Sequence, residues 1–140
     1  MLFRSNYVLT AVNALSIMDF LDWMFDYCIG PTDVYSGRSF FNISPVFRLD
    51  FLGIAALPPE LRKLALDRLS MGKLKYQGLE STPLTQFFIN SVDRFIQIFD
   101  ATPHNPQYVK QFVDYIKLED TASSKPLSAV VPEWAPYFQS

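Results

Sequence analysis

The stretch that decides the fold is Asn6-Tyr-Val-Leu-Thr-Ala-Val-Asn-Ala-Leu15, which runs on into Ser16-Ile-Met-Asp-Phe-Leu-Asp-Trp-Met-Phe-Asp-Tyr-Cys-Ile29. Its first part, residues 7–12, is rich in β-branched and aromatic side chains, as in a strand covered on both faces in a parallel sheet. Farther along, apolar residues recur at helical spacing: Ile17, Phe20, Leu21, Met24 and Cys28. The stretch predicts a buried strand that leads into an amphipathic helix.

A second candidate strand, Phe40-Phe-Asn-Ile-Ser44, ends at Pro45, which cannot donate to a ladder. If it pairs parallel to the first strand, the helix at 17–28 is a right-handed crossover. The predicted fold class is therefore α/β and helix-rich, with a short parallel βαβ unit. Residues 51–57 are ambiguous between an edge strand and an extended apolar segment.

From residue 58 onward the pattern is helical. Pro58-Pro59 predicts a helix start and Gly72 its end. Thr82-Pro83 is a cap followed by a first-turn proline, which predicts a buried helix over about 83–100. Further helical segments are expected at about 106–119 and 126–131, and three aromatic side chains should pin the terminus to the body: Trp134, Tyr137 and Phe138.

The division of the chain follows from this order of elements. Residues 1–57 form a strand–helix–strand segment and residues 58–140 a C-terminal helical region, together one structural domain. Two parallel strands alone do not make a stable sheet in water. Either the helical half covers this small sheet completely, or the sheet is expected to continue into residues that this chain lacks.

Composition excludes several classes of function. A net charge of −2 and a pI near 5.2 argue against nucleic-acid binding, which needs clustered basic residues. No apolar run reaches the length of a membrane span, and the N-terminus does not resemble a signal peptide. A single cysteine, Cys28, excludes an internal disulfide and indicates a reducing compartment. We expect a cytoplasmic protein with no membrane partner.

Several short sequence motifs of the chain resemble those of a known protein family. A strand ending in Asn, a short turn and a helix with Asp-Phe-Leu-Asp-Trp (19–23) resemble the late part of radical S-adenosylmethionine proteins of the twitch-domain type. Phe41-Asn42, followed by an apolar stretch and Leu-Pro-Pro-Glu-Leu-Arg (57–62), is similar to that family's C-terminal region. So is the end of the chain: Phe112-Val-Asp-Tyr-Ile116, Lys-Leu-Glu-Asp (117–120) and Leu127 to Pro132-Glu-Trp134.

The resemblance implies a fold and a function. The family fold is a partial βα barrel, so this chain would supply a barrel remnant and a C-terminal helical cap over the substrate end. The family's 4Fe–4S cluster and S-adenosylmethionine would belong to a full-length protein, because Cys28 alone cannot hold a cluster. The implied partner is an N-terminal barrel half or another protein chain. No catalytic residue is predicted in this chain.

Four side chains are candidate ligand-binding residues. Asn13 and Asn42 lie at the C-terminal ends of the two predicted strands. In open α/β folds, ligands bind outside these strand ends. Arg38 and Arg48 flank the second strand and could clamp an anionic ligand at the barrel mouth. The alternative is that the two amides satisfy turn backbone locally and that the two arginines are loop charges.

The remaining chemistry-bearing residues have plainer interpretations. Asp19, Asp22 and Asp26 share one helix face and could bind a divalent cation, but a solvated face is the simpler reading. Cys28 and His104 lie far apart in sequence and are expected to be a core cysteine and a linker histidine. The sequence therefore predicts no metal site.

Two functional interpretations follow, from different classes. In the first, the chain is the C-terminal portion of a radical S-adenosylmethionine-like iron–sulfur enzyme and is not catalytic alone. In the second, it is a small, self-contained, α-rich binding or structural protein, supported by several capped helices and an aromatic terminus that could close the core. Whether the chain belongs to an enzyme is left open at this point.

Overall fold

Helices dominate the protein. The computed structural model describes residues 5–28, 41–45, 52–122 and 126–138. In chain order these contain β1 (Ser5–Leu9), α1 (Ile17–Trp23), β2 (Phe41–Pro45), α3 (Pro59–Gln77), α4 (Pro83–Ala101), α5 (Pro106–Ala122) and α6 (Leu127–Val130). Shorter helical turns lie between or after them: η1 (Ala14–Ser16), η2 (Met24–Cys28), η4 (Ile54–Ala56) and η5 (Pro132–Phe138).

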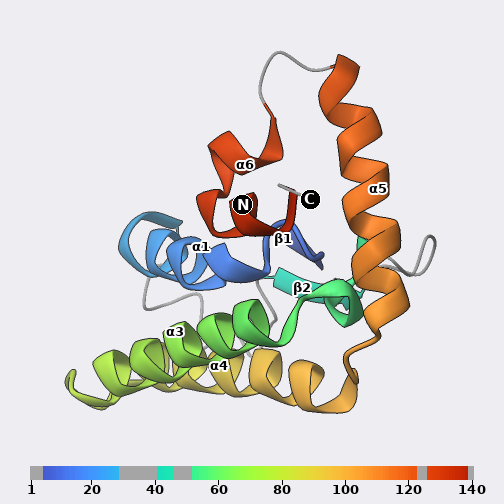
Figure 1. Ribbon diagram of the computed structural model, residues 1–140. Coiled ribbons are helices and arrows are strands. Elements are labelled where there is room, and N and C mark those ends of the chain that lie inside the picture. The colour runs from blue at the N-terminus through green and yellow to red at the C-terminus, as the bar shows by residue number, and fades with distance from the viewer. Residues whose placement is uncertain (1–4, 29–40, 46–51, 123–125, 139–140) are drawn as a thin grey trace.

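The helices are arranged around one hairpin. Figure 1 shows α3 and α4 running side by side, with α5 leaving the end of α4 and standing away from the pair. The last elements, α6 and η5, return from the far end of α5 into the space between α5 and α1. This return brings the C-terminal segment back onto the N-terminal part of the chain.

The predicted α/β fold, with a βαβ unit and a partial barrel, is wrong, and the fold is helical. The described residues include only a short parallel strand pair, in which Ser5 lies opposite Phe41 and Leu9 opposite Pro45. The predicted crossover helix, α1, packs against α3. Two five-residue strands bury too little to organise a domain, so the core forms among the helices.

Part of the core lies between α3 and α4. Each helix contributes a stripe of residues three or four apart, as expected for one buried face. The α3 stripe contains Leu61, Ala65, Leu69, Gly72 and Tyr76, and the α4 stripe contains Phe88, Val92, Phe95 and Phe99.

The start of α4 confirms the predicted cap. The side chain of Thr82 accepts a hydrogen bond from the Thr85 backbone N–H at 3.2 Å, and the Thr85 hydroxyl accepts one from the Thr82 N–H at 2.9 Å. This reciprocal pair satisfies backbone donors that the first helical turn leaves without partners.

The predicted end of α3 at Gly72 is wrong, because α3 continues to Gln77 and Gly78 is its C-cap. Gly72 is a point of close helix approach. A Cβ placed there would lie 2.2 Å from the terminal methyl carbon of Met18 on α1. Its missing side chain lets α1 lie close to α3.

The C-terminal segment is more regular than its prolines suggest, since residues 132–138 form the helical turn η5. Its aromatic side chains confirm the expected anchoring. Trp134 is fully buried, its ring centroid lies 4.6 Å from that of Phe112, and its indole N–H donates to the Ala11 carbonyl at 3.3 Å.

Candidate functional site

An open groove lies between α1 and α3. It has a volume of about 670 Å³, within the range of ligand-binding clefts. The N-terminal side contributes Leu15, Met18, Asp19 and Asp22. The groove therefore joins an apolar floor to a charged rim.

The α3 side of the groove is one row of residues on successive turns. Arg68, Met71 and Lys75 are spaced by three and four residues, so they share a face beside the buried stripe, and Gly72 of that stripe also lines the groove. Glu133 of η5 completes the lining. Three segments far apart in sequence thus build this site.

Two methionines contribute to the apolar lining. The end of the Met18 side chain lies against Gly72, and Met71, at the adjacent position of α3, is 70% exposed. Methionine is flexible and polarizable, so this lining can adapt to ligands of different shape.

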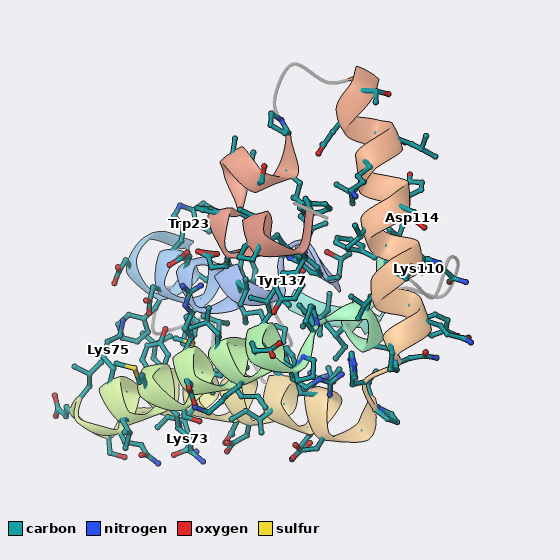
Figure 2. The ribbon with its side chains drawn as sticks, in the orientation of Figure 1. Trp23, Lys73, Lys75, Lys110, Asp114 and Tyr137 are labelled. Atoms are coloured by element: carbon teal, nitrogen blue, oxygen red, sulfur yellow. The ribbon has the colours of Figure 1, made fainter. Side chains whose placement is uncertain are left out.

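A three-residue polar contact joins α1 to α3 beside the groove. Oδ1 of Asp22 accepts hydrogen bonds from Lys75 Nζ at 2.6 Å and from the Tyr76 hydroxyl at 2.7 Å. Burial, reinforced by the hydrogen bond to Asp22, raises the pKa of Tyr76 well above its ordinary value. Figure 2 shows Lys75 on the side of α3 nearer α1, and Lys73 on the side nearer α4.

Arg68 holds the middle of the groove. Its Nη1 donates to the Leu15 carbonyl at 2.9 Å, and its Nη2 lies 3.8 Å from Oε1 of Glu133. The first contact is a hydrogen bond and the second is a looser ion pair. A guanidinium carries five N–H donors, so Arg68 keeps donors available for a ligand after both contacts are made.

The groove continues beyond Arg68 into a second lobe of about 270 Å³. Leu15, Asp19, Arg68 and Glu133 line both lobes, and the far lobe adds apolar side chains from the C-terminal segment, including Val130. Asp19 therefore lies where the two lobes meet. Within the described part of the chain its carboxylate has no hydrogen bond or ion pair.

Of the four predicted ligand-binding residues, Asn13 is not among the described residues that line the groove. Oδ1 of Asn13 accepts a hydrogen bond from the Thr10 N–H at 2.8 Å, which is the local turn role given as the alternative. Asn42 lies in β2 opposite Asn6. Arg38 and Arg48 fall outside the described residues.

The other candidate residues from the sequence make contacts within the fold or lie at the end of an element. Asp22 bonds Lys75 and Tyr76, whereas His104 contacts the Leu57 carbonyl through Nδ1 at 2.8 Å. Cys28 ends η2. Among the described residues, no group of three His, Cys, Asp or Glu side chains could hold a metal ion.

The groove residues Arg68, Met71 and Glu133 were missed by sequence reasoning. A signal existed for the first two, because positions 68 and 71 border the apolar stripe of the predicted helix. No local signal places Glu133 beside them, since its position depends on the return of the C-terminal segment to α1.

Comparison with known proteins gives no relative. No protein-family model, curated protein or solved structure matches the chain. Among the helices that the structure describes, none combines the length and apolar character needed to cross a membrane.

Proposed function

We propose that this protein is a helical binding module, and that the groove between α1 and α3 holds an extended peptide segment of a partner protein. The observation that carries the proposal is the continuity of two open lobes past Arg68. The two lobes together offer apolar and polar side chains along one open site. Such a site suits an extended peptide, because its side chains can contact the apolar surface while its backbone groups bond the polar residues.

The arrangement of donors supports the same ligand. The Leu15 carbonyl fixes the Arg68 guanidinium in the middle of the groove. Its remaining N–H groups can donate to the backbone carbonyl of a bound segment. The apolar side chains on either side, Met71 in one lobe and Val130 in the other, can contact the residues that flank that carbonyl.

The walls of the groove are held before any ligand binds. Lys75 and Tyr76 both donate to Asp22, which ties α3 to α1. A preformed site spends less binding free energy on ordering its own side chains. This supports recognition by a largely rigid surface.

The role as the C-terminal portion of a radical S-adenosylmethionine enzyme stays a prediction, and so do the implied iron–sulfur cluster, S-adenosylmethionine and N-terminal partner. The helical fold removes its barrel-completing part.

The test uses a random peptide library displayed on phage and selected on the purified chain. Selected peptides are then measured against Met71→Ser and Leu74→Ser. Both positions lie on exposed α3 surface, 70% and 68% exposed, but only Met71 lines the groove. We expect Met71→Ser to weaken binding by about fivefold, because the variant loses an apolar contact, and Leu74→Ser to leave binding unchanged.

The proposal is wrong if the two variants bind every selected peptide equally well, or if selection enriches no peptide. Thermal unfolding of both variants is the accompanying control, because exposed substitutions of this kind should leave stability nearly unchanged.

A further inference from the structure

The charges of the described groove residues do not balance. Among the residues that the structure describes, the lining contains three carboxylates, Asp19, Asp22 and Glu133, and two cations, Arg68 and Lys75. Lys75 bonds Asp22 at 2.6 Å, and Arg68 pairs with Glu133 at 3.8 Å. Within this described set Asp19 is left over, so its negative charge lies without a paired cation where the two lobes meet.

We infer that the bound segment is anchored by a lysine or arginine side chain flanked by apolar residues, with its cation at Asp19. This inference rests on the proposed function and names the chemistry of the partner. The cationic side chain matches the unpaired carboxylate of Asp19 in the described lining, and its flanking residues match the apolar side chains of both lobes.

The floor beside Asp19 suits the stem of such a side chain. Lysine and arginine pair an aliphatic stem with a charged tip, so the stem can lie on apolar surface while the tip reaches a carboxylate. Leu15 and Met18 supply that surface in the same lobe as Asp19. Negatively charged side chains would instead meet Asp19 and Glu133.

Trp23 adds a reporter near this position. It follows Asp19 by four residues, one turn farther along the same side of the α1–η2 helical segment, and is 49% exposed. Figure 2 labels Trp23 on the α1 side of the molecule. The chain's other tryptophan, Trp134, is fully buried. A change in tryptophan fluorescence on ligand binding is therefore expected to come from Trp23.

The test uses capped peptides with a central Leu-X-Leu, where X is lysine, arginine, norleucine or glutamate. Norleucine keeps the length of the lysine stem without its charge. We expect the lysine and arginine peptides to bind about threefold more tightly than the norleucine peptide, as for a partly exposed ion pair, and the glutamate peptide to bind most weakly. Added salt should reduce this preference.

Asp19→Asn should abolish the preference for lysine over norleucine. Asp26→Asn is the matched control, because Asp26 is also exposed and close in sequence but does not line the groove. That control should keep the full preference. N-acetyl-lysine methylamide, the single residue without its flanking leucines, should bind far more weakly than the lysine peptide.

The outcomes separate this inference from the function on which it rests. If Met71→Ser weakens all four peptides but norleucine binds as well as lysine, the groove binds peptides and the basic anchor is wrong. The anchor is also wrong if Asp19→Asn keeps the lysine preference, or if the single-residue amide binds as tightly as the peptide. If Met71→Ser has no effect on any peptide, the groove is not the binding site and the proposed function itself fails.

Discussion

Arg62 connects three parts of the chain through one guanidinium. Its Nη1 donates to the carbonyls of Phe99 at 3.0 Å and Thr102 at 2.6 Å, and its Nη2 donates to the carbonyl of Ile54 at 3.1 Å. Two of these carbonyls lie at the C-terminal end of α4, where backbone acceptors lack helical partners and a cation is favourable. Burial lowers the pKa of Arg62, yet a guanidinium stays charged at neutral pH.

Arg62→Lys should lower the free energy of unfolding by about 1–3 kcal/mol. Lysine keeps the charge but cannot reproduce the planar fork that reaches three carbonyls. Urea denaturation measures the loss. Lys63→Ala is the control, because Lys63 is highly exposed and makes only a 3.9 Å pair with Asp67. A loss for Arg62→Lys no larger than that for the control would contradict this role.

The raised pKa of Tyr76 predicts that the stability of the fold depends on pH in the alkaline range. Its pKa is raised in the folded state, chiefly by burial, so the folded protein favours the neutral phenol more than the unfolded chain does. This contribution to stability is fully present below the unfolded tyrosine pKa of about 10 and is lost as the pH rises above it. Tyr76→Phe should therefore show a smaller loss of stability between about pH 8 and pH 11 than the parent protein.

Denaturant midpoints of both proteins across that range measure the effect. The pKa of Tyr137 is also raised, mainly by burial, and its hydroxyl donates to Glu60 at 2.9 Å. Because Tyr137 is present in both proteins, its contribution to the pH dependence of stability is the same in each. Parallel stability curves for Tyr76→Phe and the parent would contradict the assignment.

At the level of elements, Gly72 within α3 and Gly78 at its C-cap differ in their surroundings. A Cβ at Gly78 would meet backbone oxygens only at ordinary contact distance, 3.5 Å and beyond, whereas a Cβ at Gly72 would collide with Met18. Gly78→Ala should leave stability unchanged or raise it by up to about 1 kcal/mol, since alanine lowers the entropy of the unfolded chain. Gly72→Ala should gain less, because the end of Met18 must move.

Thermal unfolding of the two variants distinguishes these sites. Equal gains at both positions would show that α1 does not lie against Gly72 as described. In the Gly72→Ala variant the displaced Met18 side chain is expected to narrow the groove, so the same protein should also bind the Leu-Lys-Leu peptide more weakly than Gly78→Ala does.

The sequence was informative where structure is local. The Thr82-Pro83 cap and the apolar stripe after it correctly predicted α4, since both signals lie within the helix itself. Gly72 was misinterpreted as a helix end, because glycine gives the same local signal at a C-cap and at a close helix contact. Only the position of Met18 in space distinguishes the two cases.

For the whole molecule, Trp134 joins the two ends of the described chain. Trp134→Phe removes the indole bond to Ala11 and part of the contact with Phe112. We expect a loss of about 2 kcal/mol in the free energy of unfolding. Trp23→Phe is the matched control, and because Trp23 is half exposed it should change stability by less than about 0.5 kcal/mol. Equal losses would mean that the C-terminal segment does not stabilise the fold.

The fold class failed at this larger scale for a physical reason. The pattern at 6–29 correctly indicated a strand followed by a helix, but no local pattern states what that helix packs against. Its neighbour is α3, far along the chain, and the sheet remains a single short pair within the described residues. The groove was out of reach for the same reason, since Asp19, Arg68 and Glu133 meet only after the helices and the terminus have packed.

The most direct measurement is a titration of isotope-labelled protein with the Leu-Lys-Leu peptide, followed by amide chemical shifts in two-dimensional NMR spectra. The account predicts that the largest shift changes cluster on both walls of the groove, at Met18, Asp19, Arg68 and Met71, while α5 is unaffected. Changes concentrated on α5, or an unchanged spectrum at saturating peptide, would contradict the claim that this groove is a peptide-binding site.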